Sequence, residues 1–288
     1  MAIILTSDVL IDNPDAPFIT LYDPIESRTG SVYLWDAGRA PIANFNAGAV
    51  LPNVLATYAQ TVVGAATTMS RDSVGGVTSI ATEITQKGGL HLMASQVNQS
   101  TSTREYIQAQ SDNTLTQYMI DNAANLYVSV WRKTTRKAIS GGASSVNFVR
   151  DASNGAFQNP VSWATFENLN GAGLVYSYLS SNQTQDVNVN VANLLATSPT
   201  SGFKGTPVST SATKMRIGAG ALTPSTTATS ANKSASQIVY RVYVEDLSKS
   251  GRTFSQVQAI DLAEFNKAFT EGGRFYGDTW SNPATVLP

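Results

Sequence analysis

The sequence contains no cysteine and a single histidine, and only 14% of its 288 residues are charged. Without cysteine, the chain can form neither a disulfide nor a thiolate metal site. An ordinary soluble domain has about 25% charged residues, so the surface of this protein must consist largely of neutral polar groups. A surface of this kind is typical of β-structure, of contact with other subunits, or of both.

The chain also lacks an excess of positive charge and any long apolar run. Its formal net charge is −1 at pH 7, whereas nucleic-acid binding takes an excess of Lys and Arg to neutralise phosphates. No apolar run approaches the ~20 residues needed to span a bilayer. The start, MAIILTSDVL, lacks both the positive n-region and the apolar length of a signal peptide. We therefore predict a soluble protein that binds no nucleic acid, inserts into no membrane and is not exported.

Short apolar stretches with period-two alternation recur from residue 79 onward, and turn residues separate them. Regular spacing of such stretches is typical of a β-sandwich. The basic run WRKTTRK, at 131–137, prolongs one of them, so we interpret it as a strand with a solvated face rather than as a phosphate-binding patch. The predicted strands are 31–35, 79–85, 90–97, 104–110, 115–120, 125–135, 145–150, 174–180, 186–191, 214–218 and 236–247.

The composition divides the chain into three parts. Residues 1–78 contain the turn-rich stretches DNPDAP and YDPIES and end near SVGG, so we predict an irregular N-terminal arm used in assembly. Within the arm, 51–66 fits either a short helix or an extended apolar segment. Residues 79–252 are predicted to form the sandwich, and 253–288 a helix with a tail.

The C-terminal helix has clear start and stop signals. Thr253 and Gln256 form a capping box at its beginning. Gly272 and Gly273 supply a stop, which bounds the helix at about 253–271. No other helix is predicted with the same clarity, so the fold class is all-β.

The strand at 236–247 shows the alternation most clearly. One face is uniformly apolar and is predicted to face the opposite sheet. This face consists of Ile238, Tyr240, Val242 and Val244. Arg241 falls on the other face, where its replacement should cost under about 0.5 kcal/mol in the isolated protein.

Two stretches resemble the laminin-G-like, concanavalin-A-like jelly-roll superfamily. The first, GGLHLMASQVNQSTSTREYIQAQ followed by NLYVSVWRK, is similar to the opening strands of that family, which end in a central Trp, here Trp131. The second, KMRIGAGALTP followed by SQIVYRVYVEDLSKSGRTFSQV, is similar to its closing hairpin and helical start. The match covers residues 79–258 and implies a jelly-roll β-sandwich. Low charge and the tail FTEGGRFYGDTW further resemble structural proteins of tailed bacteriophages.

Catalytic residues are not expected. Glycosidases of this fold resemble one another in carrying alternating acids, E-x-D-x-x-E, and no such motif occurs here. The nearest acidic pair, Glu245 and Asp246, is adjacent in sequence, so its side chains should point to opposite faces of a strand. We interpret His91, the one histidine, as a packed or surface residue, because a lone His supports no site by itself.

We also predict no metal and no cofactor. Several Asp residues at predicted strand ends are interpreted as turn residues, because neither a later Glu nor a cluster of carboxylates accompanies them. These residues are Asp112, Asp121, Asp151 and Asp186.

Aromatic residues leave room for a glycan. Large aromatic side chains stack on sugars, but they also fill cores and interfaces, and the second placement is favoured. The residues in question are Trp163, Tyr176, Tyr178, Tyr276 and Trp280.

These patterns and the resemblance favour a non-enzymatic structural virion protein of a tailed bacteriophage, as a tail, baseplate, fibre or capsid-decoration component. Made in the host cytoplasm, it would form a homo-oligomer and bind other virion proteins through its arm and tail, where Phe275, Tyr276 and Trp280 are the expected anchors. The alternative is a carbohydrate-binding lectin or adhesin that recognises a host glycan. A glycosidase is a third hypothesis.

Overall fold

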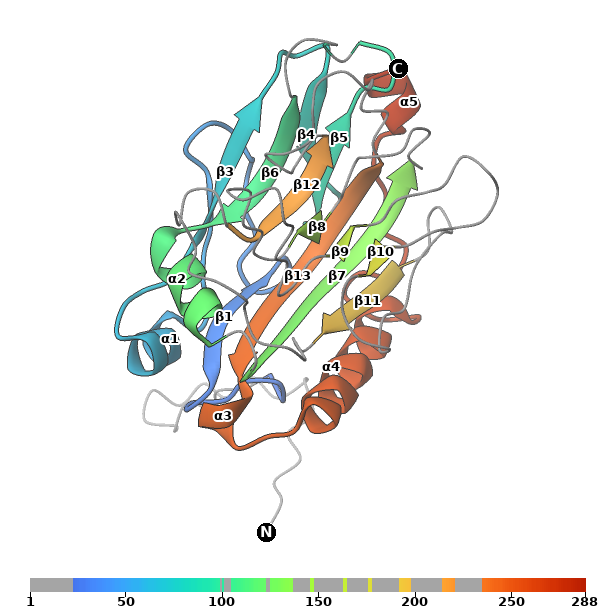
Figure 1. Cartoon of the computed structure of the whole chain (residues 1–288). Helices are drawn as coiled ribbons and strands as arrows, with labels where there is room; N and C mark the ends of the chain where they lie inside the picture. Colours follow the sequence, from blue (N-terminus) through green and yellow to red (C-terminus); the bar gives the residue numbers. More distant parts are fainter. Residues whose placement is uncertain are drawn as a thin grey trace, which may run out of the picture.

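Two large antiparallel sheets dominate the computed structural model of the chain, and helices are few (Figure 1). The two sheets share one hydrophobic core, so the protein is mostly β, as the strand pattern predicted. The residues that the structure describes are 23–98, 100, 105–122, 125–136, 146–147, 163–164, 176–177, 192–197, 214–220 and 235–288.

The larger, six-stranded sheet is built around the long strand β13 (Ser236–Asp246). Strand β7 (Leu126–Arg136) pairs with β13 along one side. On the other side, β5 (Leu90–Ala94) pairs with the first part of β13 and β1 (Ser31–Asp36) with the second part. The two remaining strands are β4 (Ile80–Ile84), beside β5, and β11 (Ala192–Thr197), beside β7.

The smaller sheet has five strands and lies against the larger one. Its order is β2 (Val50–Leu51), β3 (Met69–Val74), β6 (Tyr106–Ser111), β12 (Arg216–Gly220) and β8 (Val146–Asn147). A separate two-stranded sheet consists of β9 (Trp163–Ala164) and β10 (Tyr176–Ser177).

The inner faces of the two large sheets bury a common core. Ile107 and Ile217 come from the smaller sheet, Val128, Val130 and Val242 come from the larger one, and all five are fully buried. Burying an aliphatic side chain of this size stabilises the folded state by about 1.5–3 kcal/mol. The seam between the sheets is therefore a major source of stability.

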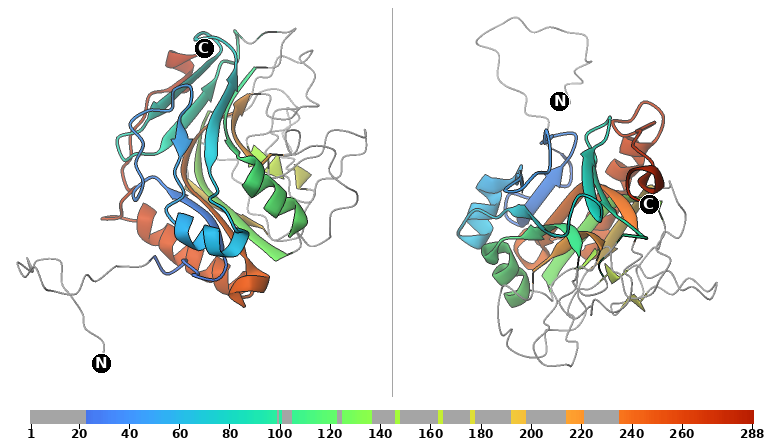
Figure 2. Two further views of the ribbon diagram at one scale, coloured as in Figure 1. Left: turned by 90° about the vertical axis from the view of Figure 1, so that its left-hand side faces the viewer. Right: turned by 90° about the horizontal axis from the view of Figure 1, so that it is seen from above.

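Helix α4 (Phe254–Phe269) covers the outer face of the larger sheet (Figure 2). It begins at the predicted capping box, in which Thr253 and Gln256 each accept a hydrogen bond from the other's backbone N–H. Phe265 and Phe269 pack edge-on against Trp131 at ring-centroid distances of 5.6 and 6.3 Å. The predicted C-terminal helix is confirmed, and it packs on the sheet of its own chain.

The structure contains more helices than the single C-terminal helix that was predicted. Helix α1 (Ala56–Val63) follows β2 and resolves the segment 51–66 as a short strand and a helix. The other helices are α2 (Asn113–Asp121), α3 (Leu247–Ser250) and α5 (Pro283–Val286). Within the described ranges, every helix is too short or too polar to cross a membrane.

The strand predicted at 115–120 is in fact helix α2. The side chain of Asp112 accepts a hydrogen bond from the backbone N–H of Leu115 at 2.7 Å, which caps the first turn. Leu115 and Met119, four residues apart, are both buried against the core. This spacing is helical, and together with the Asp cap it outweighs any period-two pattern.

The predicted boundary near residue 78 was wrong for the described part of the arm. Strand β1 pairs with β13, and β3 pairs with β6, so residues 31–74 contribute to both large sheets. Tyr33 and Trp35 of β1 are fully buried in the common core. Residues 1–22 lie outside the described residues, so an assembly role for them stays a prediction.

Strand β13 was predicted to be half-buried, but all of its residues are buried. Its register with β7 shifts between Val239 and Arg241, which makes Tyr240 an extra residue on this strand. A bulge of this kind changes which side chains share a face. Val242 therefore faces the smaller sheet, whereas Tyr240 packs on Phe269 of α4 at 5.0 Å. The four residues predicted to face the core together are divided between the two faces.

Strand β7 differs from the prediction in the same way. The basic run at 131–137 does lie in a strand as far as Arg136, but its expected solvated face is not there: Arg132 is 1% exposed, and Lys133 and Arg136 are partly buried. Of the other predicted strands, 186–191 lies outside the described residues. Two more, 145–150 and 174–180, are described only where β8 and β10 pair.

Candidate functional site: a buried charge network

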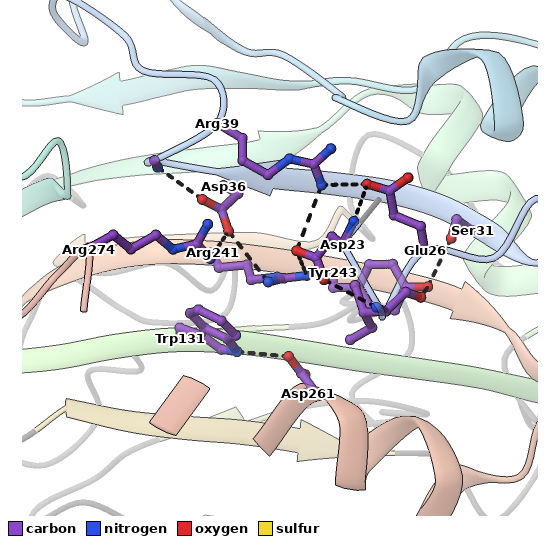
Figure 3. A network of polar contacts seen from close by, with 12 residues as sticks. Asp23, Glu26, Ser31, Asp36, Arg39, Trp131, Arg241, Tyr243, Asp261 and Arg274 are labelled. Atoms are coloured by element: carbon purple, nitrogen blue, oxygen red, sulfur yellow. Dashed lines mark hydrogen bonds and ion pairs between the residues drawn. The ribbon is translucent and has the colours of Figure 1, made fainter. Parts of the chain in front are cut away.

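Ionisable side chains gather on the outer face of the larger sheet (Figure 3). The register of β1 on β13 places Asp36 opposite Arg241, and the bulge at Tyr240 turns Arg241 toward this face. Both side chains are fully buried, and Asp23, just before β1, is 6% exposed at its side chain. The charge network, as we name it, consists of Asp23, Glu26, Asp36, Arg39, Arg241, Asp261 and Arg274.

Arg241 is the centre of the charge network. Its Nη2 lies 2.9 Å from Asp23 Oδ2, its Nη1 lies 3.5 Å from Asp36 Oδ2, and its guanidinium carbon lies 4.5 Å from the centre of the Trp131 ring. Burial acts against the charge, but Asp261, Asp23 and Asp36 outweigh it and raise the pKa of Arg241. Attraction to the carboxylates and to the aromatic face therefore keeps this side chain charged.

Two further arginines, both more exposed than Arg241, lie around this centre. Arg39 Nη1 is 2.6 Å from Glu26 Oε1 and 3.7 Å from Asp23 Oδ2. Arg274 donates a hydrogen bond to Asp36 Oδ2 at 2.6 Å. Their side chains are 31% and 32% exposed, so these two cations separate the buried carboxylates from water.

Asp261 links helix α4 to the same face of the sheet. Its carboxylate is fully buried and accepts hydrogen bonds from the Tyr127 hydroxyl at 2.8 Å and from Trp131 Nε1 at 2.9 Å. Burial raises the pKa of Asp261, although Arg241 and these hydrogen bonds act in the opposite direction. Both donors belong to β7, so these hydrogen bonds tie α4 to that strand.

A second ion pair anchors the segment that precedes β1. Arg252 donates from Nε to Glu245 Oε1 at 2.8 Å, and its Nη2 contacts the other carboxylate oxygen. The same Nη2 donates to the carbonyl oxygen of Ile25 at 2.6 Å, which the Tyr243 hydroxyl also reaches at 2.9 Å. These contacts hold the segment around Ile25 on β13.

The acidic pair at the end of β13 lies as its sequence predicted. Glu245 points to the outer face, toward Arg252. Asp246 points the other way and accepts a hydrogen bond from the Tyr118 hydroxyl of α2 at 2.6 Å. The two carboxylates therefore cannot act together on one substrate.

The chemistry of the charge network is that of a structural clamp. Arg241, Asp36 and Asp261 have no exposed surface, so none of them can reach a substrate from solution. The contacts of Arg241 and Arg274 join the N-terminal residues Asp23 and Asp36 to the C-terminal part of the chain. Buried ion pairs restrict the chain to one arrangement, because any other leaves a charge without a partner.

A hydrogen-bonded chain of three side chains crosses the same sheet. His91 Nδ1 lies 3.0 Å from Glu83 Oε1, and His91 Nε2 lies 2.8 Å from Thr135 Oγ1. This order of acid, imidazole and hydroxyl occurs in nucleophilic catalysis. Here, however, His91 is fully buried and Thr135 is 7% exposed, so the hydroxyl is closed to a substrate. His91 is a packed histidine, one of the two placements that the sequence suggested.

We expect Glu83→Gln to change how stability depends on pH. Partial burial disfavours the Glu83 carboxylate, but hydrogen bonds from His91 and Ser281 outweigh it and lower the pKa of Glu83 from 4.5 to about 2. A lowered folded-state pKa gives stability above pH 4.5 that is lost as the pH falls toward 2. Urea unfolding between pH 5 and pH 2.5 should therefore show a shallower acid loss for Glu83→Gln. Glu271→Gln, at an exposed position, is the control, and equal slopes for wild type and Glu83→Gln would contradict the assignment.

Of the five aromatic residues proposed for glycan or interface contact, the structure describes the surroundings of two, Tyr276 and Trp280. Tyr276 is 50% exposed. Trp280 is partly buried, with the Nζ of a β7 lysine 4.7 Å from the centre of its ring. Trp163 and Tyr176 lie on the paired strands β9 and β10, and Tyr178 lies outside the described residues.

The Asp residues considered as metal ligands accept hydrogen bonds from the same chain where the structure describes them. Asp112 caps α2, and Asp121 accepts a hydrogen bond from Gln117 one turn earlier at 2.8 Å. Asp151 and Asp186 lie outside the described residues. In the part of the chain that the structure describes, no three His, Asp or Glu side chains lie close enough to hold a metal ion.

Comparison of the chain with protein-family models, with curated proteins and with solved structures finds no match. The function is therefore inferred from the residues of this chain and their contacts.

The charge network was missed from the sequence, although one signal was present. Asp261 lies four residues after Val257 and four before Phe265, on the apolar stripe of the predicted helix. An acid on such a stripe needs a buried partner. Asp36 and Arg241 gave no comparable local signal, because their pairing depends on the register of β1 and on a bulge.

Proposed function

We propose that this chain is a non-enzymatic structural protein of a tailed-bacteriophage virion. Its body would be a jelly-roll sandwich, and it would assemble with further copies and with other virion proteins. One observation carries the proposal: a chain with only 14% charged residues places several of its charges inside. Asp36, Arg241, Glu245, Asp246 and Asp261 are fully buried. The remaining surface is poor in charge, as the cores of protein interfaces are.

The more specific parts of the proposal rest on the resemblance of residues 79–258. Two antiparallel sheets with a shared core are compatible with a jelly roll, and the phage assignment adds the low charge and the composition of the tail. The contact role expected of the tail changes in one respect. Phe275 is 1% exposed and packs on Tyr240 of its own sheet at 4.8 Å, so Tyr276 and the partly buried Trp280 are left as anchors.

The test is quantitative mass spectrometry of purified virus particles from cells that make the protein. The proposal expects the chain in the particle fraction at a fixed, stoichiometric copy number. Recovery of the chain only as free protein, with none above background in intact particles, would contradict it.

Glycan binding is the second candidate function, and the exposed ring of Tyr276 favours it. Binding of the purified protein on a glycan array, abolished by Tyr276→Ala without a change in melting temperature, would support a lectin. A glycan that binds equally well to the variant would place the sugar elsewhere on the chain.

A further inference from the structure

The segment that follows α4 lies across the outer face of the larger sheet. Figure 2 shows it on the same side of that sheet as α4. We name residues 278–288 the strap. Asp278, Pro283 and Leu287 are buried, Trp280 is partly buried, and the other residues of the strap are exposed. The strap therefore lies on the surface of the sandwich and is held there by a few contacts.

The first of these contacts is a carboxylate among hydrogen-bond donors. Asp278 is 6% exposed. Its carboxylate accepts hydrogen bonds from the hydroxyls of Thr85 at 2.7 Å and Tyr240 at 2.8 Å, and from the Lys87 N–H at 2.8 Å. An apolar side chain at this place would leave these donors without their partner, which is costly. The position therefore requires an acid.

The middle of the strap is bound by an aromatic contact and a backbone contact. The Trp280 ring lies 4.7 Å from Lys133 Nζ, within the range of a cation–π interaction. The Ser281 N–H donates to Glu83 Oε1 at 2.7 Å. The sheet thus offers a cation to the ring and an acceptor to the N–H that follows it.

The last residues of the strap are bound through their carbonyl groups. Arg136, at the end of β7, donates from Nη1 to the carbonyl oxygens of Pro283 at 3.3 Å and Leu287 at 2.6 Å. The Val97 N–H donates to the Pro288 carbonyl at 3.3 Å. We name the residues that receive the strap the strap seat, and they are Glu83, Thr85, Gln86, Lys87, Val97, Lys133, Arg136 and Tyr240.

The common core does not depend on the strap. Phe275 belongs to the core, but among the described residues no buried member of it comes from 278–288, and Trp280 packs only at its margin. Gly277, between Phe275 and the strap, has a φ of +68°, and a Cβ there would meet no atom within 4 Å. A change of direction at this glycine would leave α4 and both sheets in place. The strap can therefore separate from the body as a unit.

We propose that the strap exchanges between copies of this chain, so that the strap seat of one copy receives residues 278–288 of another. The strap seat selects its occupant, because a carboxylate, an aromatic ring and a row of carbonyl groups must arrive in that order. A second copy carries the same sequence and remakes every contact of the closed chain. Exchange of an identical element is a low-cost route to an oligomer. The inference rests on the proposed function, since it names one contact of the proposed homo-oligomer.

Cross-linking between two single-cysteine variants tests the exchange, because the native chain has no cysteine. Thr279 of the strap donates from its hydroxyl to Gln86 Oε1 at 2.9 Å, and both residues are exposed. Gln86→Cys and Thr279→Cys chains are incubated together, and a short bismaleimide is then added. We expect linked heterodimers, identified by intact mass.

Two controls define the outcome. A chain that carries both substitutions should link within itself, which shows that the two positions are within reach. Gln86→Cys mixed with Leu262→Cys, at a position on α4 that is 46% exposed, should stay monomeric. If the double variant links but the mixture of Gln86→Cys and Thr279→Cys does not, or if Leu262→Cys gives as many heterodimers, the exchange does not occur.

Asp278→Ala gives a second, directional test. In the Gln86→Cys copy it weakens the hold of that copy's own strap and should raise the yield of heterodimers, whereas in the Thr279→Cys copy it weakens the arriving strap and should lower the yield. Hydrogen bonds to a charged group of this kind correspond to a change of about tenfold or more in the exchange equilibrium. Thr285→Ala, at an exposed position, should change neither yield. An effect of the same sign in both copies would overturn the proposal. The particle experiment is independent of this result, so the proposed function and the exchange can fail separately.

Discussion

Replacing Arg241 with Met is expected to lower the free energy of unfolding by about 3–5 kcal/mol, the usual loss when one partner of a buried ion pair is removed. Met keeps an unbranched apolar side chain, but it removes the guanidinium over Trp131 and leaves Asp23 and Asp36 in the interior without their central cation. Asp261 also loses a charge that stabilises its ionised form. Urea unfolding at pH 7 measures the loss.

Two comparisons separate the charge effect from simple packing. Arg39→Met removes a similar side chain at a position that is 31% exposed, and should cost no more than about 1 kcal/mol. The loss for Arg241→Met should also shrink at pH 4, because burial raises the pKa of Asp261 and this carboxylate can take up a proton once Arg241 is gone. A loss below that of Arg39→Met, or one independent of pH, would contradict a stabilising role for the buried charge.

The sequence analysis placed Arg241 on a solvent face because no local pattern showed that α4 and the segment before β1 cover that face. Alternation did place Arg241 opposite Val242, and the extra residue Tyr240 is what departs from the predicted faces. Beyond it, Arg241 and Tyr243 face α4, whereas Val242 and Val244 face the smaller sheet. The existence of β13 followed from local pattern, but its burial depended on the smaller sheet and α4, which cover its two faces.

The helices, unlike the faces of β13, depended on local signals. The capping box of Thr253 and Gln256 is local, and the structure confirms where α4 begins. Helix α2 also has a local signal, the cap at Asp112, but the short apolar run after it was interpreted as a strand. The sequence contained a cap signal for each helix, but the cap at Asp112 was given less weight than the apolar run that follows it.

Strand β1 shows most clearly what the sequence alone could not predict. It was predicted as a strand, but it was assigned to the N-terminal arm and not to the larger sheet. The stretch SVYLW has ordinary strand residues, yet nothing local identifies β13, more than 200 residues later, as its partner. Pairing between distant segments is set by tertiary contacts. The turn-rich composition around β1 therefore led to a boundary that the structure does not have.

Deleting residues 2–50 is consequently expected to abolish cooperative folding, rather than to leave an intact sandwich. Val32, Tyr33, Leu34 and Trp35 are all fully buried. Four such side chains contribute on the order of 6–12 kcal/mol, which is comparable with the whole stability of a typical domain. The deletion also removes Asp36 and leaves Arg241 without this buried partner. Calorimetry of the truncated chain should show no sharp unfolding transition.

The matched control is deletion of residues 2–20, which shortens the same arm but leaves Asp23 and β1 in place. This variant should keep the cooperative transition of the full chain, with its midpoint little changed. If the longer deletion also melts cooperatively, β1 is not part of the folding unit and the arm does extend to residue 78. If the shorter deletion already destroys the transition, residues before Asp23 carry stability of their own, and the N-terminal segment is more than a means of assembly.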